Sequence, residues 1–456
     1  MPIDKKRLTD LLSAERQLFA DGHRESARAH REGAEHLFGG VPMTWMNKAA
    51  GRFPLYLRGA RGSRVTDIDG HEYVDLSLGD TGAMAGHSPP EVVAAIRGRI
   101  ENEGGITAMM PTENAAWVAA ELTRRFGVGQ WSFTLTATDA NRWAIRLARA
   151  VTRRPKVLVY AWCYHGSVDE AFALPGPDGE AVAREGNVGA PVPLSETTRV
   201  VEYNDADALE NALAHGDVAA VLMEPALTNI GIVLPQPGYL DEVRRLTREH
   251  GTLLINDETH TFSAGPGGCT RAWDLEPDMV TIGKAIAGGI PAGAYGLSAE
   301  LAERVDALSD ADLIDTGGVG GTLAGNALSV AAMRATLEKV LTDDAFDGMI
   351  ARATRFTEGV QDTIDDTGVP WSVVQLGARA EYRFTSPAPT SGSASADASD
   401  EDLEDYLHVY LANRGVLLTP FHNMALMSPA TTDADVDRHT ELFAAAVADL
   451  LSPPPC

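Results

Sequence analysis

Cysteine is scarce in this chain of 456 residues, which has only three, Cys163, Cys269 and Cys456. An odd number without metal-ligand spacing predicts neither a disulfide framework nor a cysteine metal site. Sparse cysteine of this kind is typical of a reducing compartment, so we expect a cytoplasmic protein.

Long apolar runs and an excess of positive charge are also missing. The sequence has no apolar run of about 18 residues, the length that a membrane-spanning helix needs, and its N-terminal segment has no apolar core of signal-peptide length. The chain carries 38 basic and 64 acidic residues, a net charge of −26. We therefore expect neither nucleic acid nor a membrane as a partner.

The composition is that of a globular protein with a sizeable core. Hydrophobic residues make up 44% of the chain and charged residues 22%, both ordinary values. A chain of this length suffices for two or three domains.

Between residues 132 and 297, short apolar runs alternate with longer amphipathic ones, which predicts a mostly parallel sheet covered by helices. The expected strands are Ser132–Thr136, Lys156–Tyr160, Val200–Tyr203, Ala219–Glu224, Thr252–Asp257, Met279–Gly283 and Ala294–Leu297. The expected helices are Asp139–Thr152, Ala206–Ala214, Tyr239–His250 and Ala299–Ala307.

The flanking segments predict a smaller α+β domain. Residues 5–37 favour a helical arm, and the turn Asp69-Gly70 between alternating runs predicts a β-hairpin. Toward the C-terminus we expect the helices Ala327–Val340, Phe346–Asp366, Leu403–Asn413 and Asp435–Leu450, the strands Val373–Leu376, Ala380–Phe384 and Val416–Thr419, and a mobile surface loop at Ser386–Asp400.

These elements predict a division of the chain into domains. Residues 1–65 are expected to form the arm and part of the small domain, residues 66–325 the large domain, and residues 326–456 the rest of the small domain.

The most informative residues follow two of the predicted strands. Asp257 ends the run that begins at Thr252, and Lys284 follows the run that ends at Gly283. Ligands of parallel sheets bind outside the carboxyl ends of the strands, so we expect the acid and the amine at one rim. Although a single lysine at a rim is usually only solvated, this pair suits pyridoxal phosphate, which needs a lysine to form a Schiff base and an acid to keep its pyridine nitrogen protonated.

Further motifs near this rim each have a structural alternative. The turn Ala137–Asp139 leads into a helix and offers N–H groups to a phosphate, although a plain N-cap is as common. Tyr164 is placed to lie over a flat ring, with core packing as the alternative. Glu224 ends a strand, where a plain cap is the commoner role. The glycine-rich segment 317–329 can supply Thr322 to a phosphate, with a flexible loop as the alternative.

In order and spacing, these motifs resemble the fold-type I pyridoxal-phosphate enzymes of aminotransferase class III. The resemblance is strongest to the glutamate-1-semialdehyde aminomutases and the β-amino-acid aminotransferases, and it extends from Gly39 to about Asp449. It rests on Gly86-His87-Ser88-Pro89, Thr138-Asp139-Ala140, Ala144–Arg149, Cys163-Tyr164-His165-Gly166, Met223-Glu224-Pro225, Asp257-Glu258, Gly283-Lys284, Gly288-Gly289, Gly321-Thr322 and Gly325-Asn326.

The resemblance implies an α/β fold of type I, with a mostly parallel seven-stranded sheet in a large domain beside a smaller α+β domain. It implies pyridoxal 5'-phosphate held covalently by Lys284, with Asp257 at the pyridine nitrogen and without a metal ion. Other implied cofactor contacts are Ala137, Thr138, Tyr164, Glu224 and Thr259, and Thr322 for the neighbouring subunit's cofactor. The implied assembly is a homodimer with shared active sites.

Two loops bear on the substrate. The aminomutases have an Arg in the early loop, which here reads Pro42–Asn47 without Arg, and a Glu in the late loop, where this chain has Met424. The arginine of the β-amino-acid aminotransferases is also absent from the late loop. The residues expected at the substrate are Trp45, Met46, His260, Phe421 and Met424.

The apolar character of both loops favours an aminotransferase that moves an amino group from an amine or amino acid with a bulky apolar group. The acceptor is a keto acid or aldehyde, and the mechanism is ping-pong. A glutamate-1-semialdehyde-type aminomutase is the alternative. A cofactor-binding protein without catalysis is a third interpretation, which the intact Lys284 and Asp257 disfavour.

For His260, Arg379 and Arg383, the sequence allows both a functional and a structural role. His260 can tune protonation at the ring or contact the substrate, and a structural histidine is equally consistent with the sequence. Arg379 and Arg383 are candidates for a substrate carboxylate, but Glu381 on the same strand face favours a structural ion pair.

Overall fold

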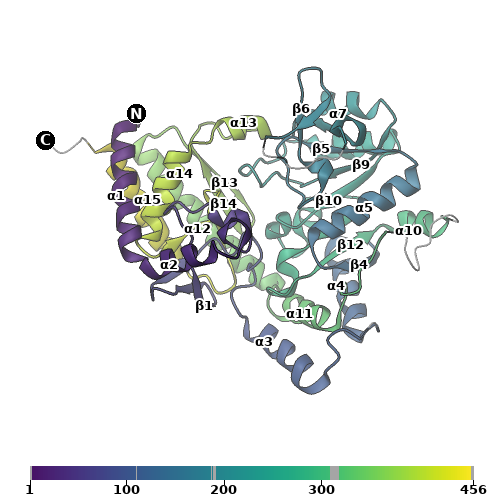
Figure 1. Cartoon of the computed structure of the whole chain (residues 1–456). Coiled ribbons are helices and arrows are strands. Elements are labelled where there is room, and N and C mark those ends of the chain that lie inside the picture. Colours follow the sequence, from purple (N-terminus) through teal and green to yellow (C-terminus); the bar gives the residue numbers. More distant parts are fainter. Residues whose placement is uncertain (1–2, 109, 186, 188–191, 309–317, 453–456) are drawn as a thin grey trace. The chain divides into compact units, whose positions relative to one another are not determined.

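The computed structural model describes residues 3–108, 110–185, 187, 192–308 and 318–452. Figure 1 shows the whole chain. The chain divides into two units. Unit 1 comprises residues 1–89, 347–388 and 398–456, and unit 2 comprises residues 90–346 and 389–397.

A seven-stranded sheet in the order β4-β12-β11-β10-β9-β5-β8 runs through unit 2. Its strands are β4 (Gln130–Thr134), β5 (Lys156–Tyr160), β8 (Thr198–Val201), β9 (Val218–Met223), β10 (Leu253–Asp257), β11 (Met279–Ile282) and β12 (Gly293–Leu297). β12 runs antiparallel to both of its neighbours, and the remaining pairs are parallel. Every residue of β9, β10 and β11 is buried, as expected for strands covered on both faces. The predicted α/β fold with a mostly parallel sheet is confirmed.

Helices surround this sheet. Those of unit 2 are α3 (Pro90–Arg97), α4 (Glu113–Phe126), α5 (Ala137–Thr152), α6 (Leu194–Thr197), α7 (Ala206–Leu213), α8 (Tyr239–Glu249), α9 (Gly268–Ala272), α10 (Ala299–Asp306), α11 (Ala327–Lys339) and α13 (Gly392–Asp397), with a π-helical turn at Gly98–Glu103 and a small hairpin of β6 (Ala173–Pro175) and β7 (Ala181–Ala183). Helix α5 contacts β9, β10, β11, β12 and β4 (Figure 1). Its buried positions Ala140, Ala144 and Ala148 are small, which lets the helix lie close to the strands.

Unit 1 contains two smaller sheets, β1-β2-β3-β15 and β13-β14-β16. Its strands are β1 (Leu57–Arg61), β2 (Arg64–Asp67), β3 (Glu72–Asp75), β13 (Ser372–Leu376), β14 (Arg379–Arg383), β15 (Val416–Leu417) and β16 (Met424–Leu426), and its helices are α1 (Lys5–Gly22), α2 (Arg24–Gly33), α14 (Glu401–Ala412), α15 (Asp433–Leu451) and most of α12 (Asp343–Thr367). β2 and β3 form the predicted hairpin. Gly70 in its turn has φ +97°, a value that favours glycine.

The two units do not coincide with the predicted ranges. Residues 66–89 lie in unit 1, because β3 pairs with β15 near the other end of the chain. Unit 2 extends to residue 346, beyond the predicted end at residue 325, and it also includes residues 389–397. Such pairings between distant segments do not appear in local sequence patterns.

The predicted loop Ser386–Asp400 contains helix α13, so the expectation of a plain surface loop is wrong. Small residues let this segment pack closely: a Cβ at Gly392 would lie 2.3 Å from the carbonyl oxygen of Ala161. Its serine hydroxyls bond elsewhere in unit 2, with Ser395 donating to the carbonyl of Ile230. The small residues that suggested a loop therefore allow this segment to pack closely against the rest of unit 2. Within the part of the chain that the structure describes, no helix has the length and apolar character needed to cross a membrane.

Candidate active site

Asp257 closes β10 and lies in a buried polar cluster. Its Oδ2 accepts hydrogen bonds from Asn141 Nδ2 at 2.7 Å and from His165 Nδ1 at 2.9 Å, and its Oδ1 accepts one from the backbone N–H of Thr259 at 3.0 Å. The residue is 3% exposed. A carboxylate offers about four acceptor directions, so these donors orient Asp257 and leave room for one more.

Asp257 and His165 hold each other in their charged forms. Burial alone would raise the pKa of Asp257, but His165, Thr259 and Asn141 outweigh it and keep this pKa below its ordinary value. Burial alone would lower the pKa of His165, but Cys163 and Asp257 raise it well above its ordinary value. Asp257 is therefore a carboxylate at neutral pH, the form that keeps a pyridine nitrogen protonated.

Lys284 follows β11 in a strained backbone conformation. Its φ is +50°, and non-glycine residues in such regions carry a cost on the order of 1–3 kcal/mol and cluster at functional sites. Its Nζ lies 2.6 Å from His260 Nε2. The preceding residue is Gly283, where a Cβ would lie 2.9 Å from the backbone nitrogen of Ala137. Only glycine therefore lets this turn approach the start of α5.

A chain of hydrogen bonds leads from Lys284 to a buried carboxylate. His260 Nδ1 lies 2.9 Å from Thr228 Oγ1. That hydroxyl donates to Glu224, whose other oxygen accepts the backbone N–H of Tyr164 at 3.2 Å. Because Thr228 gives its one proton to Glu224, His260 Nδ1 donates to Thr228 and its Nε2 presents a lone pair to the amine of Lys284. Burial also raises the pKa of Glu224.

The predicted anion site is the first turn of α5, whose start lies against Gly283. Thr136 is the N-cap of the helix, and the N–H groups of the first turn have no helical partners, so they attract anions. Thr138 Oγ1 accepts the backbone N–H of Ser167 at 3.1 Å. A Cβ at Gly166, whose φ is +75°, would lie 2.0 Å from that oxygen, so glycine allows the two turns to meet. The Thr136 N-cap does not exclude an anion site at this turn, and the anion site stays a prediction.

Buried polar atoms on two residues that bond Asp257 test the fit of pyridoxal phosphate. Within the described ranges, Thr259 Oγ1 and His165 Nε2 are buried and have no hydrogen-bond partner, whereas buried polar groups normally have one. A polar ligand with a ring nitrogen, a hydroxyl group, an aldehyde and a phosphate matches these atoms, the Asp257 carboxylate, the Lys284 amine and the N-terminus of α5. The residues present therefore fit this cofactor.

Tyr164 lies at the border of this site. Its side chain is half-exposed, and its ring meets the ring of Phe172 edge to face, with centroids 6.4 Å apart. Its backbone anchors the turn through Glu224. Stacking of Tyr164 on a cofactor ring stays a prediction, as does the cross-subunit role of Thr322, which is exposed on the turn before α11.

The remaining predicted substrate residues lie in unit 1. Trp45 and Phe421 meet edge to face with ring centroids 5.8 Å apart. Met46 is partly exposed in a short 3₁₀ helix, and Met424 is buried in β16. The structure thus brings the two aromatic residues of the early and late loops together, and their role at a substrate stays a prediction.

Arg379 and Arg383 are both buried in β14. Arg383 forms an ion pair with Glu404 of α14 at 3.7 Å, and Glu381 between them pairs with His422 at 3.5 Å. Arg383 therefore has a carboxylate partner within unit 1, which weakens its candidacy for a substrate carboxylate.

Sequence reasoning assigned no role to Asn141, His165 or Thr228. Asn141 and His165 both follow the carboxyl end of a predicted strand, and that position was a usable signal. Thr228 belongs to no motif, and its place between Glu224 and His260 depends on the folded loop after β9.

Comparison with known proteins decides the family. Residues 45–447 match the family model described as aminotransferase class III. The chain belongs to the class III aminotransferases. As a member of this family it is an enzyme that depends on pyridoxal phosphate and has fold type I, so the predicted family, fold type and cofactor are confirmed.

Several similar proteins within this family are named glutamate-1-semialdehyde aminomutases. The glutamate-1-semialdehyde 2,1-aminomutase of Desulfitobacterium hafniense is 34% identical over 397 residues, which cover 86% of this chain and 90% of that protein. The solved structure of a glutamate-1-semialdehyde-aminomutase from Pseudomonas aeruginosa PAO1 is 48% identical, with a TM-score of 0.95 over 99% of this chain and 100% of that one. Another structure of that Pseudomonas enzyme contains PMP.

A β-phenylalanine aminotransferase from Variovorax paradoxus is more distant, at 26% identity and a TM-score of 0.85 over 97% of each chain. The similarities therefore favour the aminomutase alternative over the aminotransferase for bulky apolar substrates that the loop sequences had suggested.

Proposed function

We propose that this enzyme moves an amino group between neighbouring carbons of one substrate, in a reaction of the glutamate-1-semialdehyde 2,1-aminomutase type. The observation that carries the proposal is the 48% identity over 99% of the chain to a protein of that name. The 34% identity to the Desulfitobacterium enzyme supports it. An internal transfer needs no second carbonyl substrate.

Two features of unit 1 favour a second candidate, an aminotransferase that uses a separate donor and acceptor. The early loop Pro42–Asn47 has no arginine for a carboxylate. Trp45 and Phe421 instead form an aromatic pair, which suits an apolar substrate group.

The roles proposed in unit 2 are common to both reactions. Pyridoxal phosphate, when bound, draws electrons from the substrate bond that breaks. Asp257 holds its pyridine nitrogen protonated, with His165 and Asn141 orienting the carboxylate. The α5 turn at Ala137 and Thr138 binds the phosphate, and the Thr259 hydroxyl supplies a further polar contact. The enzyme is proposed to be a homodimer, which light scattering distinguishes from a monomer.

Lys284 is the covalent anchor and, once freed, the base and acid that moves the substrate proton. His260 accepts a hydrogen bond from the Lys284 amine, which orients that amine. Thr228 and Glu224 are positioning residues that fix the His260 tautomer. The acceptor beside the Lys284 amine is therefore His260 Nε2.

The need for a second substrate tests the proposed reaction. We expect purified enzyme to isomerise glutamate 1-semialdehyde in the absence of any keto acid, measured by chromatography of the product. Failure to isomerise, together with transfer from an aryl amine to pyruvate or 2-oxoglutarate, would reject the aminomutase in favour of the second candidate.

His260→Gln tests the hydrogen-bond chain. We expect kcat to fall about tenfold, less than the roughly 10²-fold or more that a direct acid–base group contributes, and the pH profile of kcat to shift because a neutral amide replaces the imidazole beside Lys284. The exposed His215→Gln is the matched control and should leave both unchanged. An unaltered pH profile in His260→Gln would assign this histidine a purely structural role.

A further inference from the structure

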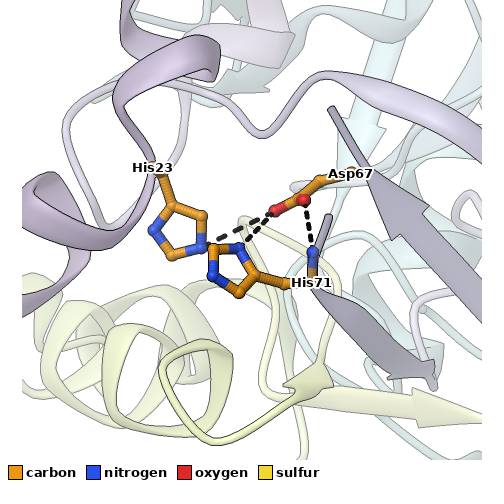
Figure 2. Close-up of side chains that lie close together, drawn as sticks. All are labelled: His23, Asp67 and His71. Atoms are coloured by element: carbon orange, nitrogen blue, oxygen red, sulfur yellow. Dashed lines mark hydrogen bonds and ion pairs between the residues drawn. The ribbon is translucent and has the colours of Figure 1, made fainter. Parts of the chain in front are cut away.

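Three side chains of unit 1 converge outside the proposed active site. His23 lies between α1 and α2, Asp67 ends β2, and His71 precedes β3 in the hairpin (Figure 2). One ligand atom of each lies within 4.8 Å of the others, and no other group of three or more potential metal ligands occurs in the described ranges.

The tautomer of His23 suits metal coordination. Its Nδ1 lies 2.6 Å from the carbonyl oxygen of Phe19, and its ring stacks on the ring of Phe19 with centroids 4.1 Å apart. A carbonyl only accepts, so Nδ1 carries the proton and Nε2 keeps a lone pair, 2.7 Å from Tyr73 Oη and 3.7 Å from Asp67 Oδ2. Metal-ligating histidines characteristically donate their other N–H to a carbonyl or carboxylate in this way.

Tyr73 links two of the three side chains. His23 Nε2 lies 2.7 Å from Tyr73 Oη, which lies 2.8 Å from Asp67 Oδ2, and the one phenol proton serves only one of these contacts. Asp67 is buried, and its ion pairs among the described residues are both with histidines.

The spacing of the ligand atoms fits a tetrahedral ion. Asp67 Oδ2 lies 3.7 Å from His23 Nε2 and 3.2 Å from His71 Nδ1. Ligands about 2.0–2.1 Å from a tetrahedral zinc ion are about 3.4 Å apart, between these values. Two imidazoles and a carboxylate are a common ligand set for such ions. A cavity of about 470 Å³, lined in part by His23, His71 and Tyr73, lies beside them.

We propose that His23, Asp67 and His71 bind a divalent transition-metal ion of the zinc type, with water from the adjoining cavity as the fourth ligand. The ion ties the junction of α1 and α2 to the β2–β3 hairpin. The three ligands belong to unit 1, whereas the proposed catalytic residues Asp257 and Lys284 belong to unit 2. The proposed role of the metal site is structural.

Metal binding to the purified, cofactor-loaded enzyme tests the site. After treatment with a chelator, we expect Zn²⁺ to bind one equivalent per chain in calorimetry and to raise the melting temperature. Co²⁺ should give visible absorption bands of tetrahedral coordination at wavelengths beyond the cofactor band. His71→Gln should weaken Zn²⁺ binding at least about tenfold.

His71 is the ligand of choice for substitution because its side chain is 46% exposed, and circular dichroism checks the fold of the variant. The exposed His36→Gln is the matched control and should bind as the unchanged enzyme does. The proposal fails if the enzyme shows no tetrahedral Co²⁺ bands, or if His71→Gln binds Zn²⁺ with unchanged affinity. Absence of binding would leave the cluster as a hydrogen-bonded chain from His23 through Tyr73 to Asp67.

Discussion

Lys284→Ala is expected to abolish turnover while the protein stays folded. Lys284 is the proposed covalent anchor and the group that moves the substrate proton, and loss of a positioned acid–base group alone costs about 10²- to 10⁴-fold. The backbone accommodates the change, since alanine meets the same strain as lysine at φ +50°. Single-turnover and steady-state assays measure the activity, and circular dichroism measures the fold.

Lys339→Ala is the matched control, because this lysine is exposed at the end of α11. It should keep the activity of the unchanged enzyme and the visible absorption that marks covalently bound cofactor, which Lys284→Ala should lose. Normal turnover by Lys284→Ala would overturn the assignment of the catalytic lysine.

Asp257→Asn is expected to retain the cofactor and lose most of the rate. The substitution preserves shape but removes the charge that keeps the pyridine nitrogen protonated, and loss of one preorganised electrostatic group typically costs about 10²- to 10³-fold in kcat. The pairing with His165 at 2.9 Å also loses its charge, so a lower melting temperature should accompany the slower turnover. Steady-state kinetics at saturating cofactor and thermal denaturation measure the two effects.

Glu258→Gln separates these effects. This neighbouring carboxylate is equally buried, but it accepts from the backbone of Cys269 and Thr270 and from the hydroxyl of Thr261. We expect it to lower stability without a comparable loss of kcat. Equal rates for Asp257→Asn and the unchanged enzyme would contradict the electrostatic role.

Local patterns predicted the sheet well because its strands are short apolar runs bounded by polar residues. β9, β10 and β11 are buried at every position, and parallel strands of this kind need no alternation. Helix α13 escaped prediction because its serines bond to distant segments. β16 escaped it because three residues are too few to show a periodicity.

The sequence by itself determined where Asp257 and Lys284 stand relative to strand ends, and so which cofactor the rim suits, since the carboxyl ends of parallel strands meet at one edge. Only the tertiary structure decided which groups surround them. Asn141 comes from α5, and His165 and Thr228 come from two separate loops. His23 reaches Asp67 across 44 positions of chain. Partnerships of this kind depend on how the elements pack, which no spacing along the chain encodes.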